Sequence, residues 1–322
     1  TTIDQGRERS LTLRGRPPGA YAIRVRAEHG TTQGPWSNAA SVTVLCPGRN
    51  FVRRVADFQP GQVLRPVHRA VMRMAAARGD LLAVLGLPEH FRTQDAAAHV
   101  AWLRGPAGDE STWSHAALYH PWLITDDDLG AGALRGLPPD GAACGTAAQR
   151  ALGRGAWIAP ANQPVRGVVE LTPTIPRDEW IRFADTQVNL LRDEPHGIVA
   201  QSADTLARDP DLVPIHVRRL LILLRRIALR VGPGYVFEPS NDAFERLVQR
   251  GFESVLEGLF ARGAFAGAQR EAAYQLVVGA EAGVADQGRF VVEIKVAPSQ
   301  PMSFLTVRLI QSGDRGVVTE VR

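Results

Sequence analysis

Apolar residues recur at steps of three and four across residues 217–231, which predicts an amphipathic helix. The apolar face of this helix consists of Val217, Leu220, Leu221, Leu224, Ile227, Ala228 and Val231. The opposite side holds most of the charge: Arg218, Arg219, Arg225, Arg226 and Arg230. The run Gly232-Pro233-Gly234 ends the pattern, because glycine and proline do not continue a helix. We expect the rest of the chain to pack around this helix.

A second helix of the same kind follows at once. Tyr235-Val236-Phe237 is predicted to form a short buried strand, after which Asn241 or Asp242 can cap the new helix. Gly263 is expected to end it. Its apolar positions are Phe244, Leu247, Val248, Phe252, Val255, Leu256, Leu259 and Phe260.

Helices and strands alternate ahead of these two helices. The helical patterns cover residues 67–78, 93–104, 138–152 and 177–184. The strand patterns cover residues 81–85, 116–124, 167–171 and 197–200. The run 81–85 is continuously apolar, as in a strand that is covered on both faces. This alternation predicts an α/β (α+β) core with a mixed sheet flanked by helices.

The last sixty residues are rich in strands. Strand patterns cover residues 274–278, 290–296, 304–310 and 317–321. Val292, Ile294 and Val296 alternate with Glu293 and Lys295, which predicts one apolar and one polar face. The final strand, made of Val317, Val318, Thr319, Glu320 and Val321, follows the flexible stretch Gly313-Asp314-Arg315-Gly316.

Residues 1–45 also read as strands, in a small all-β segment. Tyr21 follows the turn Pro18-Gly19, and residues 21–27 alternate before the strand 41–44. This pattern resembles the last strands of a fibronectin type III domain, with Tyr21 at the tyrosine corner. Since half a sandwich is present, the chain is expected to begin within a domain; an independent small β-module is the alternative. The predicted domains are thus 1–45, a linker at 46–64, a core at 65–311 and a C-terminal arm at 312–322.

Composition argues against several classes of function. The formal charge of +4 is small for this length, which argues against a nucleic-acid binder. No run of eighteen apolar residues exists, so no membrane insertion is expected. Cys46 and Cys144 form no CxxC pair or disulfide framework, which fits a reducing cytosol.

The sequence lacks the usual catalytic motifs. There is no GxxxxGK[ST], GxSxG or HExxH pattern. Asp126-Asp127-Asp128 is interpreted as a solvated loop rather than a cation site, and His115 and His120 as ordinary polar residues on opposite faces of a strand. We therefore expect no enzyme and no catalytic, cofactor-binding or metal-binding residues.

The order of several segments resembles contractile tail sheath proteins, as found in phage tails, R-type bacteriocins and extracellular contractile injection systems. The resemblance covers roughly residues 65–311, and its specificity comes from the joint order and spacing of the segments. They are ARGDLLAVLGLP (77–88), AALYHPWLI (116–124), LPPDGAACGTAAQ (137–149), GRGAWIAPAN (153–162), VNLLRDEPHGIVAQSADTL (188–206), HVRRLLILLRRIAL (216–229), VFEPSND (236–242), LEGLFARGAFAG (256–267) and DQGRFVVEIKVAPSQPMSFLTVRL (286–309).

The resemblance implies a structural subunit that stacks as rings or a helix around an inner tube and shortens to drive the tube through a membrane. It implies copies of the same chain, the tube, and baseplate and terminator or cap proteins as partners. It also implies assembly in the bacterial cytoplasm, as part of a phage tail or a tail-like particle. The strand 317–321 is suited to joining a sheet of a neighbouring copy; alone, it would be a frayed terminus.

The arginine side of the first helix has two interpretations. Arg218, Arg219, Arg225 and Arg226 either form a solvated face paired with acids such as Glu238 and Asp242, or dock onto the inner tube. Two other functions stay open: a cell-surface or glycan-binding protein, suggested by the fibronectin-like strands, and a nucleic-acid binder that uses the arginines.

Overall fold

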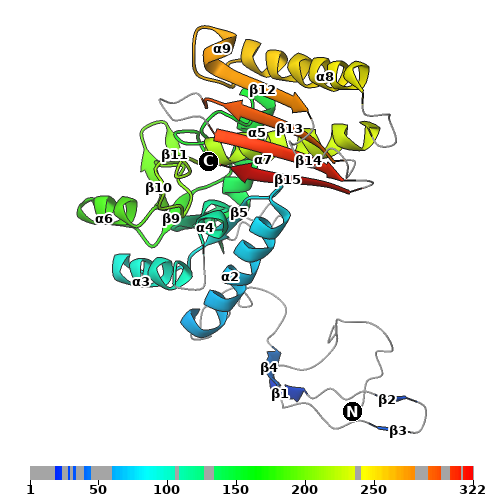
Figure 1. Cartoon of the computed structure of the whole chain (residues 1–322). Helices are drawn as coiled ribbons and strands as arrows, with labels where there is room; N and C mark the ends of the chain where they lie inside the picture. The colour runs from blue at the N-terminus through cyan, green and yellow to red at the C-terminus, as the bar shows by residue number, and fades with distance from the viewer. Residues whose placement is uncertain are drawn as a thin grey trace. The chain divides into compact units, whose positions relative to one another are not determined.

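A computed structural model shows the chain as two compact units, Thr1–Phe58 and Gln59–Arg322 (Figure 1). The structure describes residues 19–23, 28–29, 32–33, 40–44, 60–105, 109–126, 134–235, 241–279, 289–298, 305–312 and 315–321. Side chains are described for residues 64–105, 109–126, 134–235, 241–279 and 291–298.

The first unit contains two short antiparallel pairs. Strand β1 (Gly19–Ile23) pairs with β4 (Ala40–Val44), and β2 (Glu28–His29) pairs with β3 (Thr32–Gln33). Tyr21 lies in β1 opposite Val42. The fibronectin type III resemblance is not confirmed, and the strand predicted at 11–13 lies outside the described residues. The predicted linker ends earlier than expected, since α2 begins at Pro60.

A mixed four-stranded sheet forms the first layer of the second unit. Its order is β11-β10-β6-β5; β5, β6 and β10 are parallel, whereas β11 is antiparallel to β10. These strands are β5 (Ala83–Gly86), β6 (Ala116–His120), β10 (Val188–Glu194) and β11 (Gly197–Ala200). This mixed sheet flanked by helices confirms the predicted fold class.

Helices cover both faces of the mixed sheet. On one face, apolar side chains of the sheet pack in one cluster with α2 (Pro60–Arg78), α3 (Thr93–Leu103), α4 (Glu110–Ser114) and α6 (Trp180–Asp185). On the other face, they pack with α5 (Asp140–Arg154) and the first residue of α7 (Ile215–Val231). The expectation that residues 81–85 are covered on both faces is confirmed, because Leu85 packs in the first cluster and Val84 against the second.

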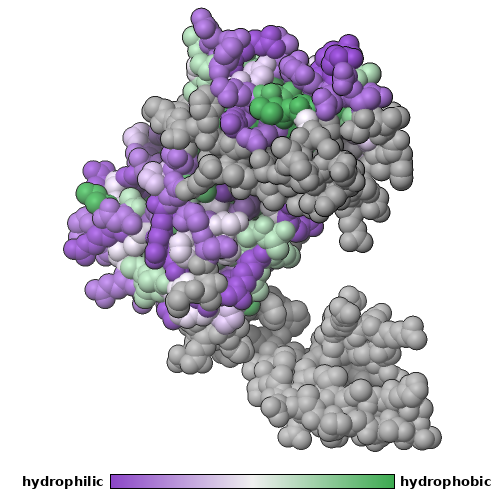
Figure 2. Space-filling view, in the orientation of Figure 1, coloured by the Kyte–Doolittle hydropathy of each residue, from purple (hydrophilic) through white to green (hydrophobic). Residues whose placement is uncertain are grey.

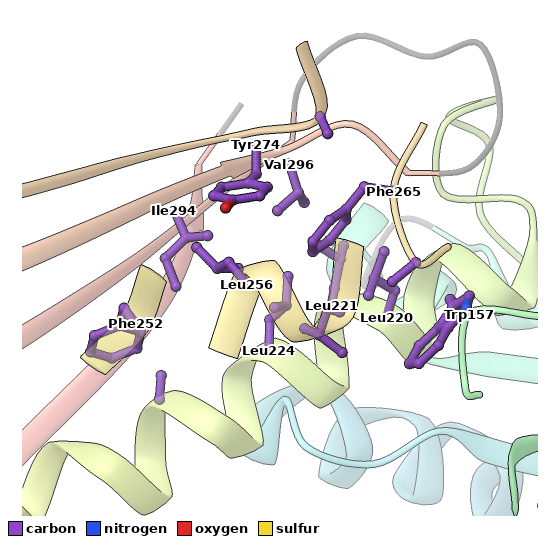
Figure 3. Close-up of a cluster of buried hydrophobic side chains, with 14 of the residues drawn as sticks. Trp157, Leu220, Leu221, Leu224, Phe252, Leu256, Phe265, Tyr274, Ile294 and Val296 are labelled. Carbon is purple, nitrogen blue, oxygen red and sulfur yellow. The ribbon is translucent and has the colours of Figure 1, made fainter. Parts of the chain in front are cut away.

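Helix α7 joins the mixed sheet to a second sheet. Its apolar face packs against α8 (Asp242–Ala261) and against a four-stranded antiparallel sheet of order β12-β13-β14-β15 (Figures 1 and 3). Figure 3 shows Leu221 and Leu224 pointing toward Leu256 of α8, with Ile294 and Val296 of the sheet above them. The strands are β12 (Tyr274–Gly279), β13 (Arg289–Val296), β14 (Leu305–Ser312) and β15 (Arg315–Val321). Both predicted helices and all four C-terminal strands are confirmed.

Local sequence signals explain where these elements begin and end. The Asn241 side chain accepts a hydrogen bond from the Phe244 amide at 2.9 Å, which satisfies one of the free N–H groups at the start of α8. Gly263 follows this helix with a positive φ of 75°, a conformation that favours glycine. The predicted cap and stop of α8 are both confirmed.

Three expectations need correction. The single strand predicted at 116–124 is two strands in different sheets, β6 and β7 (Trp122–Asp126), separated at Pro121, which has no N–H for a ladder. Strand β7 lies between β8 (Leu134–Leu137) and β9 (Glu170–Thr172).

Tyr235 lies in a 3₁₀ turn, Gly232–Tyr235, rather than in a strand; residues 236 and 237 are outside the described part. His115 and His120 are fully buried instead of ordinary polar residues.

Three buried histidines lie on the face of the mixed sheet that is covered by α2, α3, α4 and α6. His68 of α2 and His99 of α3 approach to 3.0 Å between Nδ1 and Nε2, and His120 stacks on Phe183 with ring centroids 5.5 Å apart. Burial lowers the pKa of His68 and His120 to about 4 and that of His99 to about 3. At pH 7 the folded chain therefore holds all three histidines in the neutral form.

We expect the stability of the folded chain to fall between pH 6.5 and pH 4. Because burial lowers the pKa of His120 only in the folded state, the unfolded chain takes up the proton first as the pH drops below 6.5. At pH 5 the protonation of His120 in the unfolded chain alone lowers the free energy of unfolding by about 2 kcal/mol. Urea denaturation at pH 7 and pH 5 measures the loss, and His120→Gln should reduce it. An unchanged pH dependence in that variant would contradict the prediction.

Candidate functional site

The arginines of α7 are not one solvent-facing row. Arg218 is 1% exposed, and its guanidinium donates a hydrogen bond to the Ser114 hydroxyl of α4 at 2.8 Å. The expectation that Arg218 shares an exposed face is therefore wrong. The periodicity of α7 shows its apolar face, but it does not show that α4 covers part of the polar one.

Arg219 and Arg225 are half-buried against neighbouring elements. Arg219 donates to the Ala147 carbonyl of α5 at 3.0 Å, and burial lowers its pKa. Arg225 lies over Gly79, whose φ is +66°; a Cβ at that position would come within 2.8 Å of the Arg225 Cζ. The positive φ favours glycine at residue 79, and a larger residue there would also displace the Arg225 guanidinium.

Arg226 is the exposed member of the four arginines predicted to dock. Its Nε donates to the Asp80 carbonyl at 3.1 Å. The Asp80 carboxylate binds Arg78, and this hydrogen bond, with a smaller contribution from the charge of Arg226, lowers the pKa of Asp80. Of the predicted acidic partners, Asp242 is the first residue of α8 and Glu238 lies outside the described residues. The arginine side of α7 is mainly an internal junction that leaves Arg226 accessible.

The C-terminal segment predicted to enter a neighbour's sheet is paired within its own chain. All five of its predicted exchange residues lie in β15, antiparallel to β14: Val317 opposite Ile310, Val318 opposite Leu309, Thr319 opposite Arg308, Glu320 opposite Val307 and Val321 opposite Thr306. In the single chain, residues 315–321 are therefore not a frayed terminus. Within the described strands, β12 and β15 form the two edges of this sheet.

The described side chains show no group of three metal-binding residues. Among the described helices, none is long and apolar enough to cross a membrane. Cys144 lies exposed on α5 with a free thiol, and Asp126 is the exposed last residue of β7. The other two aspartates of the acidic loop, Asp127 and Asp128, are outside the described residues.

No protein-family model matches the chain, and no curated protein matches it. Several solved structures, however, match the chain. The sheath complex of PVC, an extracellular contractile injection system in its contracted state, matches with a TM-score of 0.59 at 25% identity over 68% of this chain and 61% of that one. The chain has the contractile sheath fold.

Two further structures support the sheath fold. A chain of the contracted anti-feeding prophage baseplate matches with a TM-score of 0.67 at 19% identity, over 79% of this chain and 66% of that one. The contracted anti-feeding prophage helical sheath matches with a TM-score of 0.55 at 23% identity, over 76% of this chain and 73% of that one. The chain spans 61% of the length of the PVC protein, so the likeness concerns the shared part. The resemblance read from the sequence is confirmed.

Sequence reasoning missed one surface of this sheath fold. Helix α2 exposes Val67 and Met74, which are 51% and 53% exposed. A signal was present: residues 67, 70, 74 and 77 are apolar at helical spacing, on a helix that contains four arginines and no acid.

Proposed function

We propose that this chain is a subunit of a contractile sheath, in a phage tail or a contractile injection system. In this role the chain is a structural protein rather than an enzyme; it polymerises around an inner tube and contracts to drive the tube through a target membrane. The observation that supports the proposal is the sheath fold, shared with two sheath assemblies in the contracted state. Assembly in the bacterial cytoplasm and contacts with tube, baseplate and terminator or cap proteins belong to the same proposal.

The β14–β15 pair supports strand exchange between copies. Among the described strands, β15 forms an edge of its sheet, and each of its seven residues is paired with β14. The same segment from a neighbouring copy can form an identical ladder, so exchange retains the hydrogen bonds of β14 and costs little once the subunits are close. A heterologous exchange of this kind builds rings or filaments instead of closed dimers.

The tube contact is proposed for the accessible part of the α7 arginines. Arg226 is exposed, Arg219 and Arg225 are half-buried beside it, and Arg218 lies behind them. An arginine at such a surface attracts acidic groups on a partner and sets the rate and register of docking. We therefore expect Arg226 to be the principal contact of the four.

Charge reversal of Arg226 tests this contact. Arg226→Glu is expected to lower the amount of sheath assembled on tubes about tenfold, because it places a carboxylate against an acidic surface. Co-expression with the tube protein, followed by negative-stain electron microscopy, measures the yield of striated tubes. The control is Arg250→Glu on the exposed side of α8, which should assemble normally.

The possible outcomes distinguish the tube contact of Arg226 from the sheath role of the chain. Normal assembly of Arg226→Glu would remove the tube contact but leave the sheath role standing. A wild-type chain that stays monomeric with its tube present, and binds carbohydrate or duplex DNA instead, would overturn the sheath role.

A further inference from the structure

Helix α2 presents an apolar stripe to the outside of its unit. Val67 and Met74 are each about half exposed, and Ala70 and Ala77 on the same stripe are exposed. The opposite side of the helix is in the core, through His68, Met72 and Ala75. An amphipathic helix of a free subunit normally has polar residues on its outer face, so this stripe indicates a binding surface.

The charges that border the stripe restrict what can bind. Helix α2 carries four arginines and no carboxylate: Arg65, Arg69, Arg73 and Arg78. Arg65 and Arg69 lie away from the stripe, over the Trp102 ring at 5.9 and 3.5 Å from its centroid. The exposed Arg73 and Arg78 border the stripe on its two sides, and Arg78 pairs with Asp80. A second α2 would place arginine against arginine, which disfavours a symmetric contact. An acidic surface with an apolar centre is the complementary occupant.

Helix α6 has this complementary pattern. Ile181 is 72% exposed, and the exposed carboxylates of Asp178 and Asp185 lie three residues before it and four residues after it, on the same helical side. Figure 2 shows a strongly hydrophobic spot among hydrophilic residues over α6, at the left of the view. Of the neighbouring arginines, Arg177 and Arg192 hold their guanidinium groups over the Trp180 ring, 5.5 and 4.1 Å from its centroid. Arg182 is also exposed, about 100° around the helix from Ile181, so it lies beside the docking side and not on the line from Asp178 to Asp185.

The dimensions of the two helices also agree. Val67 and Met74 are two turns apart, about 10 Å along the axis, with the small Ala70 between them. A branched side chain of a partner can therefore pack over Ala70 between the two larger side chains, as a knob packs between helices. Ile181 has the required exposure, and carboxylates on both sides of it can reach the α2 arginines.

We propose that α6 of one subunit docks on α2 of a second copy, with Ile181 seated over Ala70 between Val67 and Met74. Asp178 and Asp185 then lie near Arg73 and Arg78, the two arginines that border the stripe. This inference rests on the proposed sheath function, since it supplies a contact between copies in the lattice. In Figure 1, α2 and α6 occupy separate places within one unit, so the two surfaces meet only between copies. The contact is heterologous and therefore propagates.

Disulfide crosslinking between two populations of subunits tests the contact. Both populations carry Cys46→Ser and Cys144→Ser; one also carries Ala70→Cys and the other Ile181→Cys. Mixing under mild oxidation should give a crosslinked heterodimer, because a disulfide needs Cβ atoms about 4 Å apart. The matched control replaces Ala70→Cys by Leu247→Cys on α8, where the native side chain is 50% exposed. We expect at least tenfold more crosslink with the α2 cysteine than with the control.

A charge exchange provides the second measurement. Arg73→Glu alone and Asp178→Arg alone should each lower the crosslink yield several-fold, and mixing the two variants should restore it. Thermal melting of each variant shows that it is folded.

Equal crosslinking with the α2 cysteine and the α8 control would overturn the inference. If wild-type subunits form sheath while the crosslink is absent and the charge variants assemble normally, this contact is wrong and the sheath function remains. If wild-type subunits form no sheath yet the specific crosslink appears in concentrated protein, the contact stands without the function.

Discussion

Arg218→Glu is expected to destabilise the folded chain by about 3–5 kcal/mol, the cost of leaving an uncompensated charge in the interior. Arg218 is 1% exposed and is bonded to the buried Ser114 hydroxyl. A carboxylate at this position loses the guanidinium hydrogen bonds and takes a negative charge out of water. Urea denaturation followed by circular dichroism measures the change in the free energy of unfolding.

Arg226→Glu is the matched control for this prediction. Arg226 lies on the same helix but is exposed, and its side chain bonds a backbone carbonyl. A surface substitution of this kind changes stability by about 0.5 kcal/mol or less. Equal stability of the two variants would show that residue 218 is accessible in solution. The comparison also decides which arginine can be used to probe the tube, since a variant that unfolds cannot report on docking.

Phe252→Ala is expected to cost about 3–5 kcal/mol, because it leaves a cavity in the cluster that unites α7, α8 and the second sheet. Phe252 is 1% exposed and lies at the centre of α8 (Figure 3). The surrounding residues belong to two helices and a sheet, so they can close the cavity only by moving whole elements. The free energy of unfolding from urea titration is again the quantity to measure.

Leu247→Ala on the same helix separates packing from helix propensity. Leu247 is 50% exposed, so its truncation removes little buried area, while the change in helix propensity is at most a few tenths of a kcal/mol. If Phe252→Ala lowers the free energy of unfolding no more than Leu247→Ala does, the second sheet does not pack on α8 as described.

Much of this architecture follows from apolar spacing. Both α7 and α8 repeat their apolar residues over four turns or more, and Asn241 supplies a start signal and Gly263 a stop signal for α8. The C-terminal strands were predicted because Val292, Ile294 and Val296 alternate with charged residues. Long periodic segments leave few alternative structures for the chain.

The remaining features depend on tertiary contacts that a linear pattern does not contain. Strand β10 was not predicted, because Arg192, Asp193 and Glu194 at its end are typical of a surface loop. The burial of Arg218 depends on α4, which is more than a hundred positions away in the chain. For the arginines of α7, the sequence therefore indicated the helix but not which of its arginines are accessible.

Helix α7 contributes apolar side chains to the cluster beneath the β12–β15 sheet, while its first residue packs against the mixed sheet and Arg218 bonds α4. Helix α7 therefore transmits a pulling force from the C-terminal strands to the mixed sheet, because it contacts both parts along most of its length. The two sheets should therefore move together as one rigid body under load. Deformation of an assembly should then occur at the contacts between neighbouring subunits.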